Sequence, residues 1–244
     1  PEIQKMVRIS VKKIVGIEPD PMMVKLLIDY DVPVESPKNT LRLNGPRMGF
    51  SSTIGKAGEI LSESDKNKGG FDMFPVNFQF GWQQEIQYIS AGNFQALIEN
   101  LFLIGGLESG KFVPSYSALL GFRFGKGAWE FGFGPTFRLI KKANGFYDAD
   151  GLIGKKGEWH LENQWNPNDS IGGALAGQNN YAIESRLDSR GTTELSTGLV
   201  IAVGKTFRSG YLNIPVNLFF APRKDGSTVG VMIGFNIQKK KKVK

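Results

Sequence analysis

The most constraining feature of the sequence is a strict alternation close to its C-terminal end. Five large apolar residues occupy every second position there: Val229, Val231, Ile233, Phe235 and Ile237. The residues between them are small or uncharged: Gly230, Met232, Gly234, Asn236 and Gln238. A period of two predicts a β-strand with two different faces. A bulky face opposite a small, uncharged one suits lipid outside and a crowded polar interior, so the pattern predicts a strand of a membrane β-barrel.

Similar strands recur along most of the chain after residue 46. The further candidates are Met48–Leu61, Phe74–Gln83, Phe94–Leu107, Tyr116–Phe124, Trp129–Leu139, Leu195–Gly204 and Leu212–Phe220. Among them Phe94–Leu107 alternates least regularly, and its run LIENLFLIGG also fits the period of a helix. Flanking glycines and strand-like neighbours favour a strand. The sequence therefore predicts about eight strands, and single-chain bacterial barrels have even strand numbers.

The connections between these strands fall into two classes that alternate along the chain. The short ones are the turns near Ser90, Lys126 and Ser209. The others, which include the longest, follow Leu61, Leu107, Lys142 and Ala221. In an up-and-down barrel the two classes lie at opposite rims, with short turns in the periplasm and long loops outside. Both termini are then expected in the periplasm.

Together these patterns predict an all-β fold, a closed antiparallel up-and-down transmembrane β-barrel with a short N-terminal appendage. We assign residues 47–238 to the barrel, with 144–183 as a long extracellular loop, and 239–244 to a basic periplasmic tail. Residues 1–46 have sparse glycine and mixed charges. We expect them to form a periplasmic leader that packs on the barrel end or on a partner, with a partly disordered linker as the alternative.

A barrel of this size has no open channel, because inward side chains fill its interior. The predicted inward positions include four charged residues, Glu85, Arg123, Glu130 and Arg138. Buried charges must be paired or hydrogen-bonded. We therefore expect these four residues to form a polar network that holds the barrel closed, with a catalytic or proton-conducting role as the alternative.

Aromatic residues gather near the predicted strand ends. They are Phe74, Trp82, Tyr88, Tyr116, Trp129, Phe146, Tyr147, Phe207 and Tyr211. Aromatic side chains at both membrane–water interfaces form such belts in membrane proteins. We expect interfacial belts here, with ordinary strand aromatics as the alternative.

The sequence offers few groups for chemistry. It has no cysteine and a single histidine, His160, which lies in the polar loop together with Trp159 and Trp165. A histidine with a serine and a carboxylate could hydrolyse lipid esters, but no partner serine is marked by spacing. One histidine without cysteine cannot build a metal cluster, and no cofactor is expected. We expect no enzyme, and we expect Trp159, His160 and Trp165 to form a partner- or surface-binding loop.

The formal net charge of +7 is concentrated in one place. Five lysines form the C-terminal tail: Lys239, Lys240, Lys241, Lys242 and Lys244. After the last strand of a barrel, this tail would lie at the inner leaflet or reach a periplasmic partner, and a solvated tail is the alternative. We therefore expect no nucleic-acid binding.

Several strings carry a resemblance to known proteins. They are GPRMGF (45–50), FGWQQE (80–85), PSYSALLGFR (114–123), EFGFGP (130–135), NIPVNLFFAP (213–222) and GFN (234–236). Over most of residues 45–236 the chain resembles a family of uncharacterised outer-membrane β-barrel proteins of Bacteroidota and similar bacteria. The resemblance implies fold and location, and it transfers no active residue.

We expect a small non-porin barrel of the bacterial outer membrane that serves as a structural or accessory subunit of a larger envelope complex. Its expected partners are lipopolysaccharide, phospholipid and the other proteins of that complex. A lipid-modifying enzyme of the acyl-hydrolase type is one alternative. A soluble lipocalin-like ligand-binding barrel is the other, although the bulky phenylalanine faces are too large for one small interior.

Overall fold

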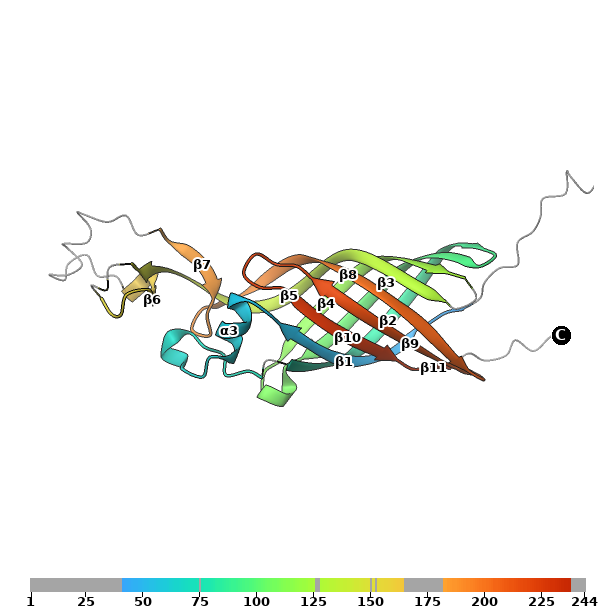
Figure 1. Ribbon diagram of the computed structural model, residues 1–244, viewed down its shortest axis with the longest axis horizontal. Helices are drawn as coiled ribbons and strands as arrows, with labels where there is room; N and C mark the ends of the chain where they lie inside the picture. The colour runs from blue at the N-terminus through green and yellow to red at the C-terminus, as the bar shows by residue number, and fades with distance from the viewer. Residues whose placement is uncertain are drawn as a thin grey trace, which may run out of the picture. The chain divides into compact units, whose positions relative to one another are not determined.

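The computed structural model describes residues 41–74, 76–125, 128–149, 151, 153–164 and 182–237. Within these ranges, eight antiparallel strands form a closed barrel in the order β10–β1–β2–β3–β4–β5–β8–β9 (Figure 1). They are β1 (Gly45–Thr53), β2 (Val76–Ala91), β3 (Phe94–Gly105), β4 (Val113–Phe124), β5 (Trp129–Asp148), β8 (Thr192–Ser209), β9 (Leu212–Ala221) and β10 (Thr228–Gly234). The ring closes because β10 pairs with both β1 and β9. The predicted fold class is confirmed.

The last barrel strand is interrupted once and then continues in the same register. Ile233 of β10 lies opposite Val216 of β9, and Asn236 of β11 (Asn236–Ile237) lies opposite Asn213. The interruption falls opposite Pro215, which has no N–H to donate to the ladder. The alternation predicted for this segment is confirmed, because Val229, Phe235 and Ile237 are exposed whereas Met232 and Asn236 are buried.

The outer wall of the barrel is apolar around its whole circumference. Large exposed side chains come from every barrel strand and include Phe50, Phe80, Phe102, Leu120, Phe133, Ile201, Leu218 and Val229. A continuous apolar surface of this extent is unfavourable in water, and it is the surface that membrane barrels present to lipid. A soluble ligand-binding barrel would place these side chains inside.

Most of the predicted belt aromatics are exposed, with one clear exception. Trp129 and Phe207 are exposed near one end of the barrel, and the Lys205 Nζ lies 5.1 Å from the centroid of the Trp129 ring. An amphipathic lysine beside exposed aromatic rings is typical of a membrane interface. Phe146, in contrast, is only 1% exposed, so its assignment to a belt is wrong.

The two ends of the barrel are different, as the loop lengths predict. We call the end that carries the β2–β3, β4–β5 and β8–β9 turns the turn end, and the opposite end the loop end. Gly92 and Gly210 open two-residue hairpin loops with φ values of 55° and 60°. A positive φ at the first loop residue is what a type II′ turn requires, and glycine adopts it without strain.

The loop end contains structure that the alternation did not predict. β1 ends at Thr53, and residues assigned to its continuation form the helix α3 (Lys56–Ser62). Gly55, at φ 82°, lies between the strand and the helix, directly before Lys56, and Ala57 is the buried residue of the helix. The single-turn helices η1 (Lys66–Lys68) and η2 (Leu107–Ser109) follow in the loops at this end. None of the helices in the described part of the chain is long and apolar enough to span a membrane.

The predicted loop 144–183 is partly a sheet. β5 continues to Asp148, beyond the residues it pairs with on β4, and β6 (Glu158–Leu161) and β7 (Glu184–Leu187) pair with this continuation. The turn η3 (Glu162–Gln164) follows β6. We call β6, β7 and β5 from residue 142 onward the sheet extension; it projects from the loop end in Figure 1. Residues 165–181 lie outside the described residues.

The assignment of residues 1–46 to a leader is tested only at its last residues. Residues 41–46 belong to the barrel, because β1 begins at Gly45 and Leu41 and Leu43 are buried. The rest of the leader, residues 1–40, lies outside the described residues. So do Trp165 and the lysine tail, and the predictions made for them stay predictions.

The effect of a charge on the apolar wall should depend on how deep in the membrane the substituted residue lies. Phe133→Arg, in the stretch of β5 that pairs with both β4 and β8, should lower the free energy of unfolding in phospholipid vesicles by about 2–4 kcal/mol, because arginine is costly at the bilayer midplane. Tyr211→Arg, at the turn end, should cost about 0–1 kcal/mol. Urea unfolding followed by tryptophan fluorescence measures both. Equal losses at the two positions would contradict a transmembrane placement of this wall.

Candidate functional site

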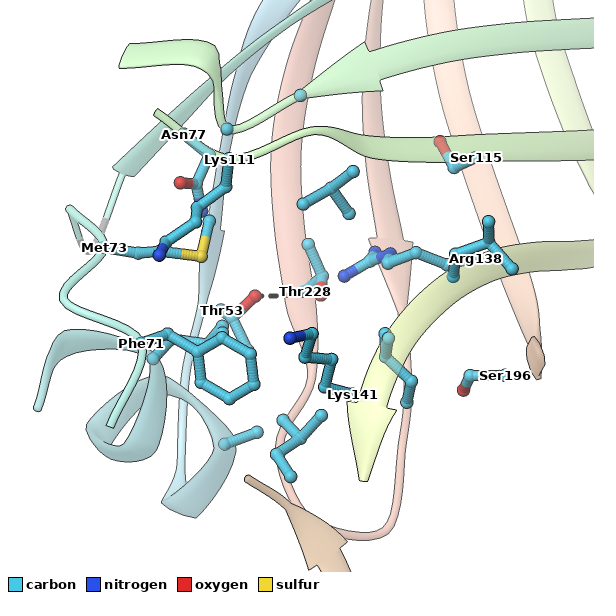
Figure 2. A pocket seen from close by; sticks show the side chains of 18 of the residues that line it. Thr53, Phe71, Met73, Asn77, Lys111, Ser115, Arg138, Lys141, Ser196 and Thr228 are labelled. Carbon is cyan, nitrogen blue, oxygen red and sulfur yellow. Dashed lines mark hydrogen bonds between the residues drawn. The ribbon is translucent and has the colours of Figure 1, made fainter. Parts of the chain in front are cut away.

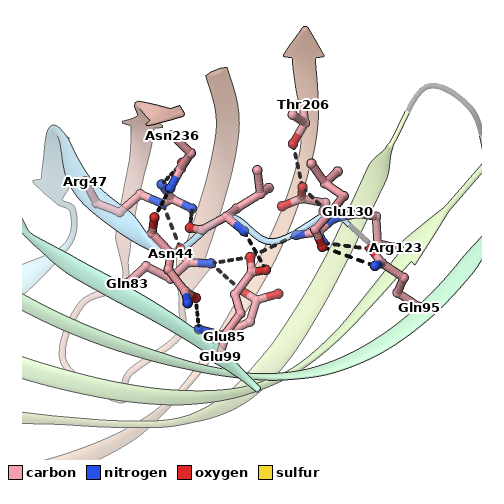
Figure 3. A network of polar contacts seen from close by, with 12 residues as sticks. Asn44, Arg47, Gln83, Glu85, Gln95, Glu99, Arg123, Glu130, Thr206 and Asn236 are labelled. Atoms are coloured by element: carbon pink, nitrogen blue, oxygen red, sulfur yellow. Dashed lines mark hydrogen bonds and ion pairs between the residues drawn. The ribbon is translucent and has the colours of Figure 1, made fainter. Parts of the chain in front are cut away.

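The centre of the barrel interior near the turn end is the guanidinium group of Arg123, on β4. Its Nη2 lies 2.8 Å from Glu85 Oε1 on β2, and its Nε lies 3.0 Å from Glu130 Oε1 on β5. Its Nη1 donates to Gln95 Oε1 on β3 at 2.8 Å. One side chain thus connects three other strands across the lumen (Figure 3).

A second arginine, Arg47 on β1, extends the network toward the barrel seam. Its Nε donates to Gln83 Oε1 at 2.8 Å, and its Nη1 donates to Asn236 Oδ1 at 2.9 Å. Gln83 in turn donates to Glu85 at 3.1 Å and to Glu99 at 3.2 Å. The network therefore runs from the seam strands across to β5, and it reaches β8 through Thr206, whose hydroxyl donates to Glu130 Oε1.

Residues 41–44, which we call the inner segment, complete the network from inside the lumen. The Leu43 amide donates to Glu85 Oε2 at 2.9 Å, and the Leu43 carbonyl accepts from Arg47 Nη2 at 2.9 Å. The Leu41 carbonyl accepts from Arg123 Nη1 at 3.3 Å, and Asn44 Oδ1 accepts from the Glu85 amide at 2.6 Å. Main-chain groups of the inner segment thus satisfy charges that the barrel wall alone leaves open.

This half of the lumen is closed to water. The side chains of Arg123 and Gln95 and the residue Leu43 are 0% exposed, so no water-sized passage reaches them. Such a closed, polar interior agrees with the small diameter of an eight-stranded barrel. Each charge in it has a partner of opposite charge or a hydrogen bond, which is the condition for keeping charges out of water.

Glycines on the inner wall make room for the large side chains of this network. A Cβ added at Gly121 would lie 2.1 Å from Glu99 Oε1, and one added at Gly234 would lie 1.9 Å from Arg47 Nη1. Neither neighbour can move aside freely, since hydrogen bonds hold both Glu99 and Arg47. The glycine-rich inward faces noted in the sequence are therefore the complement of the bulky polar side chains.

An apolar layer lies next to the network inside the barrel. Leu119, Val200 and Ala221 form a buried cluster, and Phe219 packs against it. A small cavity of about 70 Å³ is lined both by this cluster and by Arg47 of the network. The same small cavity is also lined by Arg138, so it lies between the network and the loop-end half of the lumen.

The loop-end half of the lumen is hollow. It contains a cavity of about 580 Å³ that is lined by inward residues of the barrel strands, by α3, and by the links from β3 to β4 and from β9 to β10 (Figure 2). The predicted network residue Arg138 lies here, on β5, and not with Glu85, Arg123 and Glu130. It makes no hydrogen bond or ion pair with another described residue, so its place in the predicted network is wrong.

The sheet extension is fixed to the barrel by a buried tryptophan and an aspartate. Trp159 of β6 is 5% exposed, and its Nε1 donates to Asp188 Oδ2 at 3.0 Å. Asp188 also pairs with Arg190 Nη2 at 2.8 Å. The guanidinium carbon of Arg186 lies 4.3 Å from the centroid of the Trp159 ring, and its Nη2 donates to the carbonyl of Lys68 in η1 at 2.9 Å. The indole of Trp159 is therefore buried inside the sheet extension and does not lie at its surface.

His160, the single histidine, lies beside Trp159 on β6. Its ring centroid is 5.9 Å from that of Phe146, and its Nε2 is buried without a hydrogen-bond partner among the described residues. No hydrogen bond joins it to a serine or a carboxylate in the described ranges. Nor do any three histidine, aspartate or glutamate side chains in those ranges lie where they could hold a metal ion.

Several members of the network are not among the four residues predicted for it. Arg47, Gln95 and Glu99 occupy inward positions of their strands, so alternation alone could have placed them inside, as it did Asn236. The contribution of the inner segment could not be found in this way, because residues 41–44 belong to no strand. Parity states which face a residue occupies, but it does not state at which depth of the lumen the side chain lies.

Replacement of Arg123 should destabilise the barrel far more than replacement of Arg138. Arg123→Gln leaves Glu85 and Glu130 buried without their charge partner, so it should lower the free energy of unfolding by about 3–5 kcal/mol. Arg138→Gln removes no such contact and should change it by about 0.5 kcal/mol or less. Urea unfolding of the refolded barrels in the same lipid gives both values. Similar losses in the two variants would contradict the assignment of the central role to Arg123.

The stability of the sheet extension should depend on pH through Asp188, which lies outside the barrel strands. Burial by itself raises the pKa of Asp188, but hydrogen bonds and charge from Arg190, with the indole of Trp159, lower the pKa below its usual 3.8. The carboxylate therefore stabilises the extension above pH 3.8, and this stabilisation is lost as the pH falls through the folded-state pKa.

Fluorescence of Trp159 should report this loss in a variant whose other tryptophans are phenylalanine. We expect the emission to shift toward that of an exposed indole on acidification. Asp188→Asn should show the shifted emission already at neutral pH and little further change. Identical pH profiles with and without Asp188 would contradict the assignment.

Comparison with known proteins gave matches at the level of solved structures only. No protein-family model and no curated protein matches the sequence, so membership in the Bacteroidota family stays a prediction. The chain is similar to the attachment invasion locus protein of Yersinia pestis, with a TM-score of 0.36 and 11% identity over 79% of this chain and 95% of that one. The same protein in complex with the heparin analogue sucrose octasulfate gives a TM-score of 0.34 at 11% identity, with the same coverage of 79% and 95%. Outer membrane phospholipase A from Escherichia coli gives 0.29 at 10% identity, over 82% of this chain and 93% of that one.

Proposed function

We propose that this protein is a non-conducting β-barrel of the bacterial outer membrane that serves as an accessory subunit of a larger envelope complex. The observation that carries the proposal is the sheet extension beyond the barrel. Within the described residues, β6 and β7 each pair with β5 alone, so each has an outer edge without a strand partner. Exposed strand edges pair readily with a strand of another chain.

The extension is rigid enough to present such edges. Arg186, Asp188 and Arg190 connect β7 and the following turn to Trp159 of β6 and to the η1 loop. Because these contacts already order the extension, binding of a partner costs less conformational entropy than it would for a flexible loop. Ile183, directly before β7, is 57% exposed although it lies outside the apolar wall, and we assign it to the contact with the partner.

The closed lumen supports a role without transport. The interior at the turn end holds side chains that water does not reach, so the proposal excludes a porin function for this half of the barrel. In the proposed orientation the turn end and both termini face the periplasm, and the loop end faces outward, as short turns and long loops do in bacterial barrels. The apolar wall then contacts phospholipid and lipopolysaccharide.

The proposed role is non-enzymatic. Lipid hydrolysis by a histidine requires a nucleophile and an orienting carboxylate within hydrogen-bond distance. His160 packs on Phe146 and makes neither contact with a described residue. The proposed role is therefore the binding of a partner at the sheet extension.

Photo-crosslinking in intact membranes tests the proposed docking. A benzophenone amino acid at Ile183 should give a discrete adduct with one envelope protein, because this position lies at the proposed contact. The same group at Ile237, which is exposed at the turn end, is the matched control and should not give that adduct. Ile183→Glu should lower co-purification of the adduct partner several-fold.

Two results would contradict the accessory role. One is purification of the barrel alone from gently solubilised membranes, with no adduct at Ile183. The other is the same adduct from Ile183 and Ile237, since an unspecific neighbour would produce it. Folding of each variant is checked by the shift in gel mobility on heating.

A further inference from the structure

The loop-end cavity has a strongly unbalanced charge. Its lining includes six cationic residues, Lys111, Arg138, Lys141, Lys142, Arg223 and Lys224, and a single acidic one among the described residues, Asp225. Arg138 lies inside the cavity, whereas Lys141 and Lys224 are exposed at its rim. Positive charges in a recess with low-dielectric walls focus the field and attract anions.

Two guanidinium groups converge within this cavity on the same part of β8. Arg138 of β5 lies directly opposite Ser196 of β8 in the sheet register. Arg223, from the link between β9 and β10, donates through Nη1 to the hydroxyl of the same Ser196. A Cβ added at Gly198 would lie 3.3 Å from Arg223 Cζ, so this guanidinium lies flat against the wall where glycine leaves space.

Polar atoms around this point are buried without partners. Arg223 Nε and Nη2 are buried and have no hydrogen bond among the described residues, and the same holds for Asn77 Oδ1 elsewhere in the cavity lining. A buried polar group without a partner is unfavourable, and arginine has five donors arranged to bind carboxylate or phosphate. The turn-end network, in contrast, gives each of its arginines acceptors from several strands.

Part of the cavity wall is apolar. Leu61 of α3, Phe71, Met73 and Val113 are among the residues that line it. Figure 2 shows Phe71 and Met73 across the cavity from Arg138 and Ser196. A volume of about 580 Å³ is far larger than one inorganic anion needs and falls in the range of small-molecule sites.

We propose that the loop-end cavity binds an amphiphilic anion, with its phosphate or carboxylate head between Arg138 and Arg223 and its apolar portion against Phe71 and Met73. The head group supplies acceptors to the two guanidiniums, and the apolar portion displaces water from the α3 side. This site is independent of the docking edge on the sheet extension.

Titration with hexyl phosphate tests the site. The full-length protein is placed in nanodiscs of phosphatidylcholine, and binding is followed by calorimetry and by NMR signals of arginine Nε–H groups. Wild type should bind hexyl phosphate more tightly than inorganic phosphate, which lacks the apolar portion. Arg138→Gln and Arg223→Gln should each weaken binding of hexyl phosphate about tenfold or more, because each removes charge-assisted hydrogen bonds.

Matched controls separate the site from general surface charge. Arg208→Gln removes the same charge from an exposed position at the turn end and should leave binding unchanged. Arg138→Lys keeps the charge and should retain part of the affinity, and heat-modified gel mobility confirms that each barrel is folded. Equal weakening by Arg208→Gln, or unchanged affinity in both cavity variants, would overturn the proposal.

The same experiment distinguishes two sources of the anion. With phosphatidylglycerol added to the nanodiscs, competition against hexyl phosphate supports the site and assigns its ligand to membrane lipid. Retained binding without competition supports the site and assigns the ligand to a soluble amphiphile. Tighter binding of inorganic phosphate than of hexyl phosphate would overturn the assignment of an apolar subsite.

Discussion

The structure depends on one ionic arrangement, the guanidinium of Arg123 between the carboxylates of Glu85 and Glu130. A charge inside a narrow barrel has no access to bulk water, so it must be matched by charges that other strands supply. Because Glu85 is on β2 and Glu130 on β5, satisfying Arg123 requires these strands to hold their native stagger. The same requirement keeps the inner segment in the lumen, since Leu41 and Leu43 supply the remaining donors and acceptors.

The fold could be predicted because alternation is a local property that survives closure into a barrel. Every predicted strand exists, and even Phe94–Leu107, which places leucines inside, forms β3. Prediction failed where the environment changes along a strand. Beyond Gly55 the chain leaves the wall and becomes helical, and beyond Lys142 β5 pairs with β6 and β7 outside the barrel. Neither change can be recognised from the alternation of apolar and polar residues along the chain.

The candidate site shows the same limit more sharply. Inward parity correctly placed Glu85, Arg123, Glu130 and Arg138 inside, but it could not tell that Arg138 lies at another depth. Which inward side chains meet depends on the tilt and stagger of the strands, which the sequence of one strand does not contain. The two halves of the lumen consequently have opposite characters. One is filled and electrically balanced, and the other is hollow and cationic.

The pairing of glycines with large polar side chains has a consequence for how such a barrel can change over time. Gly121 with Glu99, and Gly234 with Arg47, are pairs in which one member occupies the space that the other leaves. A side chain introduced at either glycine is tolerated only if its neighbour on the adjacent strand becomes smaller. Related sequences should therefore differ at both members of a pair together, and this covariation could identify distant homologues whose overall identity is too low to align.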